Sequence, residues 1–121
     1  MDLRRAIDPD QRQHCIDQCL ECHMTCLEFA AELACEEDAD AGELAALLED
    51  CAEICLMHAS SLVRRSVWLN RPLTELCAEI CERCAAACSL RGAEGKAGEC
   101  QSVCDVCSES CLSVSEARVL Q

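Results

Sequence analysis

The feature that most constrains this chain is a run of four cysteines within residues 15–26, CIDQCLECHMTC, separated by four, three and four positions. A β-strand would place Cys15 and Cys22 on opposite faces, because side chains alternate along a strand. An α-helix advances about 100° per residue, so steps of four, three and four return to the same face. The spacing therefore predicts a helix with a stripe of thiols along one side.

The same spacing recurs along the chain. Two further complete copies occupy residues 77–88 and 100–111, and a partial copy at 51–62 has histidine and leucine in place of its last two cysteines. Repeats this regular in 121 residues indicate that one structural unit is used four times. The stripes are Cys15, Cys19, Cys22 and Cys26; Cys51, Cys55, His58 and Leu62; Cys77, Cys81, Cys84 and Cys88; and Cys100, Cys104, Cys107 and Cys111.

Cap and turn signals divide the chain into four helices. Asp8 followed by Pro9 is typical of a helix start, and we expect the first helix to run from there to about Cys35. The other helices are expected at about residues 41–69, 72–90 and 98–117, separated by an acidic segment, an Asn-Arg-Pro turn and a glycine-rich loop. We therefore predict a single all-α domain over residues 1–121, an up-down-up-down four-helix bundle with a cysteine-lined core.

Counting outward from the loops places one residue of each stripe at the same height along the bundle. The predicted layers, about 5 Å apart, are Cys26, Cys51, Cys88 and Cys100; Cys22, Cys55, Cys84 and Cys104; Cys19, His58, Cys81 and Cys107; and Cys15, Leu62, Cys77 and Cys111. Fourteen of the 15 cysteines lie on this axis. Cys35, nine residues beyond Cys26, points to the opposite face of a continuous helix.

Packing alone does not explain so many cysteines in a core. The chain has one phenylalanine, one tryptophan and no tyrosine, and cysteine fills less volume than the leucine that usually packs such a bundle. Disulfides are a poor alternative, because their geometry is demanding and 15 cysteines leave at least one thiol unpaired. In a reducing compartment this usage indicates metal or redox chemistry.

Charge distinguishes between the metals that bind thiolates. Soft thiolates suit Cu(I), Zn(II) and iron–sulfur clusters, but iron–sulfur cysteines are typical of loop motifs. Four zinc layers with four thiolates each would add a charge of about −8 to the interior of a chain whose net charge is already −13. Cu(I) accepts two or three bridging thiolates, so each ion replaces about one proton. The pattern favours Cu(I), and a zinc or cadmium buffer is the alternative.

Helical CxxxCxxCxxxC stripes repeated along a short four-helix chain resemble the bacterial copper storage proteins. The resemblance covers nearly the whole chain. It implies a four-helix bundle that binds many Cu(I) ions through core cysteines, and homo-oligomers that are commonly tetramers in the cytosolic branch. His58 and Leu62 depart from the pattern and remove two thiolate positions near one end.

The remaining candidates lie on or beside the stripes. His58 shares its layer with thiols, so we expect it to be a ligand or a gate for the metal. His23, about 70° from the centre of its stripe, and Cys35 are weaker metal candidates. A catalytic site needs one distinguished residue with an orienting partner, so we expect no enzyme. A thiol redox protein is the alternative from another class, because the stripes contain CxxC pairs.

Charge and hydropathy also bear on partners and location. A net charge of −13 argues against nucleic acid and anionic membranes as partners. The N-terminal MDLRRAIDPDQ has no apolar segment typical of a secretory signal, and no run approaches the roughly 20 apolar residues of a membrane span. If Met1 is the natural start, we expect a cytoplasmic protein, although a chain whose leader had been removed would look the same.

Overall fold

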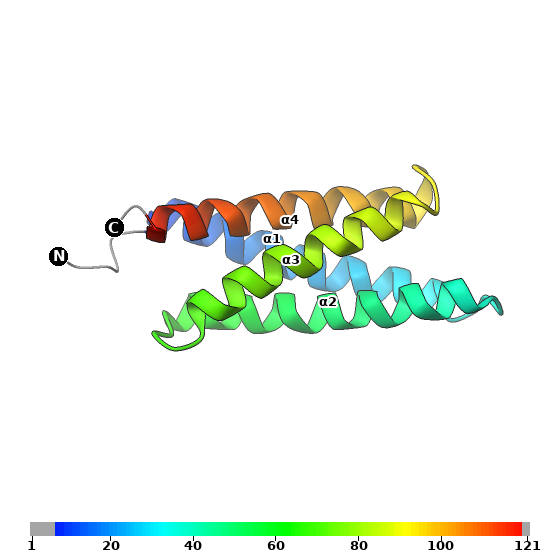
Figure 1. Ribbon diagram of the computed structural model, residues 1–121, viewed down its shortest axis with the longest axis horizontal. Coiled ribbons are helices and arrows are strands. Elements are labelled where there is room, and N and C mark those ends of the chain that lie inside the picture. Colours follow the sequence, from blue (N-terminus) through cyan, green and yellow to red (C-terminus); the bar gives the residue numbers. More distant parts are fainter. Residues whose placement is uncertain (1–6, 120–121) are drawn as a thin grey trace.

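The computed structural model describes residues 7–119, and this range contains four helices: α1 (Pro9–Leu33), α2 (Ala39–Arg64), α3 (Asn70–Ser89) and α4 (Gly95–Val119). All four run along the long axis of the molecule, with α3 inclined across the others (Figure 1). α1 and α3 each pack against α2 and α4. The predicted up-down-up-down bundle is confirmed. Residues 1–6, on which the expectation of no secretory signal partly depends, lie outside the described range.

Aspartate caps begin the first two helices. The carboxylate of Asp8 accepts a hydrogen bond from the Asp10 amide at 2.9 Å, and Pro9 is the first residue of α1, as predicted. α1 ends at Leu33, two residues earlier than expected. The acidic residues that follow would lie at the negative end of the helix dipole. One of them, Asp38, instead caps α2 by accepting a hydrogen bond from the Ala41 amide at 2.6 Å.

α2 ends at Arg64, well before the expected residue 69. Arg65 adopts the left-handed conformation with φ of 54°. The Arg65 amide donates to the Leu62 carbonyl, and the Ser66 amide donates to the Ser61 carbonyl, which together form a Schellman cap. Glycine usually occupies the left-handed position of such a cap. The expected boundary was therefore wrong, because an arginine at that position gives no sequence signal.

The last two helices begin earlier than the turn residues indicated. α3 starts at Asn70, so Pro72 lies in its first turn. Proline is tolerated there because the N–H groups of the first turn have no partner within the helix. α4 starts at Gly95 rather than at Gly98. A Cβ added at Gly98 would lie 2.1 Å from the Ala93 carbonyl oxygen, so the close approach of the loop to the helix requires glycine there.

The core has cysteine along its length and apolar side chains near its ends. All 14 cysteines of the four stripes are fully buried. Leu33, Leu44 and Leu48 are buried near the α1–α2 loop, while Leu62 and Val114 are buried toward the end that carries the chain termini. The predicted thiol axis is confirmed, and it lies between apolar layers.

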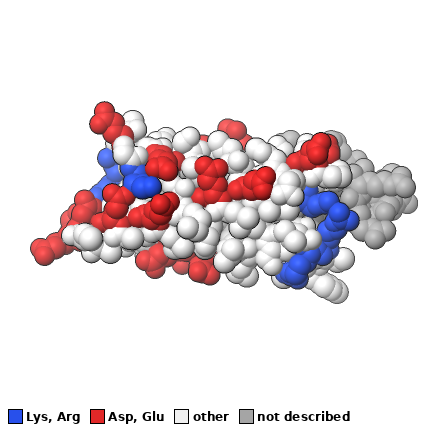
Figure 2. Space-filling model, turned by 180° about the vertical axis from the view of Figure 1, so that it is seen from behind, with Lys and Arg blue, Asp and Glu red and all other residues white. Residues whose placement is uncertain are grey.

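The charged residues on the visible face in Figure 2 form separate acidic and basic groups. Figure 2 shows Asp and Glu along the visible face and Lys and Arg gathered near the two ends of the molecule. This distribution gives that face no broad basic patch of the kind that nucleic-acid binding requires. Within residues 7–119, none of the helices is both long enough and apolar enough to cross a membrane.

Candidate metal centre

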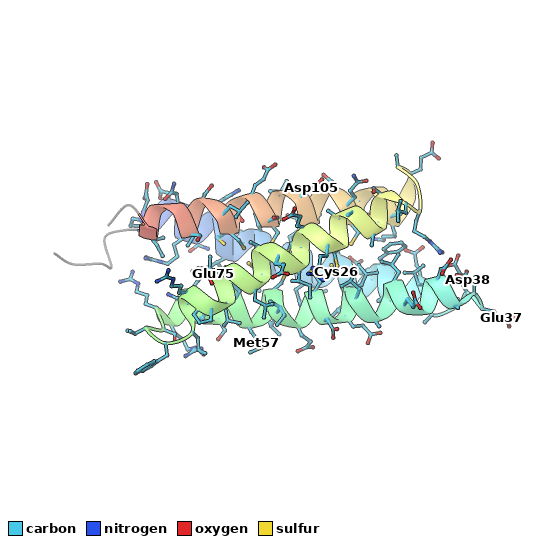
Figure 3. All side chains as sticks on the ribbon, viewed as in Figure 1. Cys26, Glu37, Asp38, Met57, Glu75 and Asp105 are labelled. Carbon is cyan, nitrogen blue, oxygen red and sulfur yellow. The ribbon has the colours of Figure 1, made fainter. Side chains whose placement is uncertain are left out.

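The thiol stripes of α1 and α4 face each other in the predicted register. The Sγ–Sγ distances across this pair are 3.9 Å for Cys15–Cys111, 3.8 Å for Cys19–Cys107, 3.7 Å for Cys22–Cys104 and 3.7 Å for Cys26–Cys100. Figure 3 shows Cys26 between the helices. The predicted pairing of layers is therefore confirmed for these two helices.

The stripes of α2 and α3 do not follow the predicted layers. The Sγ atom of Cys55 lies 3.6 Å from that of Cys81 and 3.8 Å from that of Cys77, whereas the prediction paired it with Cys84. Cys84 instead donates to the Leu47 carbonyl at 3.7 Å. The layer prediction was wrong here because α2 ends earlier and α3 begins earlier than expected, and because α3 runs obliquely (Figure 1). Residues at equal distances from the α2–α3 loop therefore do not lie at the same height along the bundle axis.

The core ligands form five groups of four residues. In each group, all four ligand atoms lie within 4.8 Å of one another. In order of shared members, the groups are Cys15, Cys19, His58 and Cys111; Cys19, Cys77, Cys107 and Cys111; Cys55, Cys77, Cys81 and Cys107; Cys22, Cys51, Cys55 and Cys81; and Cys22, Cys26, Cys51 and Cys104. Each group shares two residues with the next. The core is therefore one continuous chain of ligands, and Cys84, Cys88 and Cys100 lie outside these five groups.

Hydrogen bonds between the thiols change their acidity. The hydrogen bond with Cys111, followed by that with Cys19, lowers the pKa of Cys15 to about 4 against the opposing effect of burial. The pKa of Cys111 is raised, mainly through its hydrogen bond with Cys107. Neighbouring sulfurs thus favour opposite protonation states. The network can stabilise some thiolates, the form that binds a metal.

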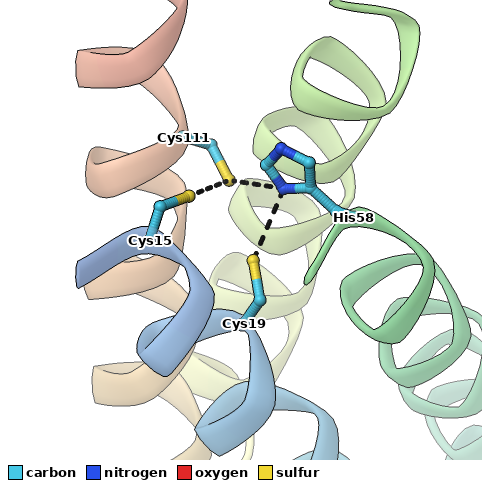
Figure 4. A group of neighbouring side chains, drawn as sticks. All are labelled: Cys15, Cys19, His58 and Cys111. Atoms are coloured by element: carbon cyan, nitrogen blue, oxygen red, sulfur yellow. Dashed lines mark hydrogen bonds between the residues drawn. The ribbon is translucent and has the colours of Figure 1, made fainter. Parts of the chain in front are cut away.

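His58 is fully buried and points into the first group, as Figure 4 shows. Its Nδ1 lies 3.4 Å from the Sγ atom of Cys19 and 3.6 Å from that of Cys111. Its Nε2 lies 2.8 Å from the hydroxyl oxygen of Thr74. Burial acts to lower the pKa of His58, but the interaction with Cys77 and the negative charge of nearby thiolates outweigh it, so this pKa is raised.

Two candidates from the sequence lie outside the thiol chain. Cys35 is exposed just beyond α1, and its Sγ contacts the Ala31 carbonyl at 3.9 Å. His23 is half-buried, and its Nδ1 lies 2.7 Å from the Ala52 carbonyl oxygen. Neither residue belongs to the five groups, so the structure does not bring them to the other candidates.

The sequence prediction overlooked Thr74, which contacts His58. Thr74 lies three residues before Cys77, so it continues the stripe of α3 by one further step. The signal was therefore present in the helical spacing. A threonine hydroxyl is not a soft metal ligand, so a pattern of metal-binding residues did not include it.

A four-helix bundle whose axis is a continuous chain of buried thiols defines a class of metal–thiolate proteins with many adjacent sites. The family model described as copper storage protein (Csp) matches residues 8–116. The chain therefore belongs to the copper storage protein family. No curated protein matches the chain.

Solved structures of Ccsp from Streptomyces lividans are similar. A structure of this copper storage protein loaded with 10 copper equivalents is 25% identical, has a TM-score of 0.87, and is matched over 97% of this chain and 92% of that one. The structure of a cytosolic copper storage protein from the same organism with five coppers is 24% identical, with a TM-score of 0.82 and coverage of 88% and 93%. A histidine-to-alanine mutant of Ccsp is 24% identical, with a TM-score of 0.86 and coverage of 93% and 98%.

Proposed function

We propose that this protein stores and buffers multiple Cu(I) ions along its core, without catalysis. The observation that carries the proposal is the sharing of two residues between each ligand group and the next. A bridging thiolate binds two ions at once, so neighbouring groups can be filled together by a metal that needs few ligands per ion. Membership of the copper storage family supports this function, as does the similarity to a Ccsp structure loaded with 10 copper equivalents.

The core thiols and His58 are the proposed ligands. Of the three core cysteines outside the five groups, Cys100 joins the thiol chain through Cys26 at 3.7 Å and Cys104 at 4.0 Å, and we include the buried Cys84 and Cys88 of α3 as further ligands. We place Cys35 and His23 outside the store, because the structure keeps both away from the ligand groups. By analogy with the Streptomyces protein that is described as cytosolic, we propose that the protein acts in the cytoplasm.

Zinc or cadmium is the second candidate cargo, because four thiols at these separations also suit a tetrahedral ion. Ions with four separate ligands cannot share residues, so at most three of the five groups could be filled in that way. Three such zinc sites would leave a net charge of about −5 in the core, which is costly without compensation. The overlap of the groups therefore favours Cu(I).

Thiol redox chemistry is less well supported by the site. A redox cysteine is typically accessible and has a low pKa. The 14 core cysteines are fully buried, and the exposed Cys35 is separated from the thiol chain.

Titration of the protein with Cu(I) against a competing chelator tests the proposed function. We expect uptake on the order of one ion per core thiol, because bridging thiolates serve more than one ion. The experiment uses protein purified anaerobically, with Zn(II) as a competitor in a parallel series. Saturation at about three ions, or preferential retention of Zn(II), would contradict copper storage and favour separate four-coordinate sites.

His58→Phe should slow copper loading several-fold and leave the final capacity nearly unchanged. The substitution removes one ligand from the group nearest the chain termini, whereas thiolates hold most of the metal. A stopped-flow loading trace beside an end-point titration measures both quantities. His23→Phe is the control and should load like the unaltered protein, because His23 is outside the groups. Native loading by the His58 variant would exclude a role in metal transfer.

We also propose that the protein forms homo-oligomers, with a tetramer as the expected state from the family resemblance. Leu20, Met24 and Leu27 follow one face of α1 and are 42%, 57% and 37% exposed. An apolar helix face that the monomer leaves open is commonly covered by another chain. Light scattering should report a mass above that of the monomer, and Leu20→Glu combined with Leu27→Glu should reduce it. A monomer at all concentrations would contradict this expectation.

A further inference from the structure

We propose that Thr74 is a positioning residue for copper binding: it holds His58 in the tautomer that carries hydrogen on Nε2 and leaves Nδ1 free to bind Cu(I). The inference rests on the proposed copper storage function and adds a residue that is not itself a metal ligand. It follows from the hydrogen-bond partners available to one buried hydroxyl group.

The direction of the hydrogen bond between Thr74 and His58 is fixed by a third group. The Thr74 hydroxyl donates to the Asn70 carbonyl oxygen at 2.6 Å. A hydroxyl has a single hydrogen, so its oxygen can only accept from Nε2 of His58, which lies 2.8 Å away. Thr74 is 1% exposed and His58 is 0% exposed, so both groups depend on protein partners. Nε2 must therefore carry a hydrogen.

The other ring nitrogen faces the thiols. In a neutral imidazole, a hydrogen on Nε2 leaves a lone pair on Nδ1. Nδ1 lies 3.4 Å from the Sγ atom of Cys19 and 3.6 Å from that of Cys111 (Figure 4). The opposite tautomer would direct the Nδ1–H toward the position of the metal. It would also place the Nε2 lone pair against the Thr74 hydroxyl oxygen, whose hydrogen is already donated to Asn70. The contact with Thr74 therefore selects the tautomer that can bind a metal.

This arrangement is set by the helix before any metal is bound. Threonine side chains in helices commonly donate to the carbonyl four residues earlier, as Thr74 does to Asn70. Histidine ligands typically donate their second ring N–H to a partner that fixes the tautomer and the ring orientation. Because Thr74 continues the stripe of α3, its hydroxyl lies at the end of the thiol chain and meets His58 of α2 there.

His23 provides an internal reference with the opposite tautomer. Its Nδ1 lies 2.7 Å from the Ala52 carbonyl oxygen, which can only accept a hydrogen bond. Nδ1 of His23 must therefore carry the hydrogen. The two histidines are thus expected in different tautomers within one molecule.

The tautomers can be measured by nitrogen-15 NMR of the imidazole rings in the metal-free, full-length protein, at a pH high enough to keep His58 neutral, because its pKa is raised. We expect hydrogen on Nε2 of His58 in the unaltered protein and in Thr74→Ser, which keeps the hydroxyl. Thr74→Val has nearly the same shape but no acceptor, so His58 should populate both tautomers. The ring of His23 should keep its hydrogen on Nδ1 in all three proteins and so report that the fold is intact.

Copper binding at this group is measured on the same ring signals. Cu(I) is supplied at free concentrations set by a competing chelator, and the concentration that shifts the His58 signals is compared between variants. Loss of such a supporting partner typically weakens metal binding by about 10- to 100-fold, so Thr74→Val should require about that much more free Cu(I). Thr74→Ser should match the unaltered protein, as should Thr25→Val, which alters a buried threonine on α1.

The proposal is overturned if His58 in the unaltered protein carries its hydrogen on Nδ1, or if Thr74→Val binds at the same free Cu(I) as the unaltered protein. It is also overturned if Thr74→Ser loses as much affinity as Thr74→Val, because the effect would then not come from the hydroxyl. A core that takes up no Cu(I) in the unaltered protein would contradict storage itself. That result is distinct from a loaded core whose affinity does not depend on Thr74.

Discussion

Loading with Cu(I) should raise the unfolding temperature of this protein by at least about 15 °C. A ligand that binds only the folded state at 1,000 times its dissociation constant contributes about 4 kcal/mol for each site, and 1 kcal/mol corresponds to about 4 °C in a domain of this size. The core offers several linked groups, so the total effect should exceed that of one site. Circular dichroism melts of the metal-free and loaded protein, prepared anaerobically, measure the difference.

The metal-free protein should nevertheless be helical. The caps at Asp8 and Asp38 and the buried leucines near the α1–α2 loop do not depend on metal. Leu48→Ala is a suitable control, because Leu48 is fully buried outside the ligand groups. It should destabilise both forms by about 2–5 kcal/mol. A random coil without metal, or equal unfolding temperatures with and without it, would contradict a preformed metal-binding core.

The sequence predicted the thiol axis well because two independent signals agreed. Helical spacing placed each stripe on one face, and the choice of cysteine over leucine indicated that the face meets a ligand. The Sγ contacts between α1 and α4 confirm the register that was predicted for this pair. A regular spacing therefore carries information about which side chains share a face, and for one helix pair also about their relative height.

The other register depended on features that the local sequence does not encode. The end of α2 rests on Arg65 in a left-handed conformation that glycine usually adopts. The inclination of α3 follows from packing between helices rather than from the spacing along any one of them. Together they place Cys55 beside Cys77 and Cys81 instead of Cys84. Thr74 was missed for a different reason, because its role lies in the hydrogen bonding of its hydroxyl group and not in metal ligation.

Cys81→Ser should remove more copper than replacement of any cysteine outside the five groups. The Sγ atom of Cys81 has four Sγ neighbours within 4.0 Å: Cys55 at 3.6 Å, Cys51 at 3.8 Å, and Cys22 and Cys77 at 4.0 Å. Cys81 also belongs to two of the five groups, so it links one part of the ligand chain to the next. Serine has nearly the same shape but is a poor ligand for a soft ion, and we expect a loss of about two or more Cu(I) ions.

Two cysteine variants separate this effect from the loss of a single thiol. Cys88 is fully buried on the same helix but lies outside the five groups, so Cys88→Ser should remove at most about one ion. Cys35 is exposed beyond α1, and Cys35→Ser should leave the capacity nearly unchanged. End-point Cu(I) titration of the three variants, with circular dichroism to verify folding, measures the comparison. Equal losses at Cys81 and Cys88, or a loss of several ions at Cys35, would contradict the ligand chain, because copper would then not follow the shared thiols.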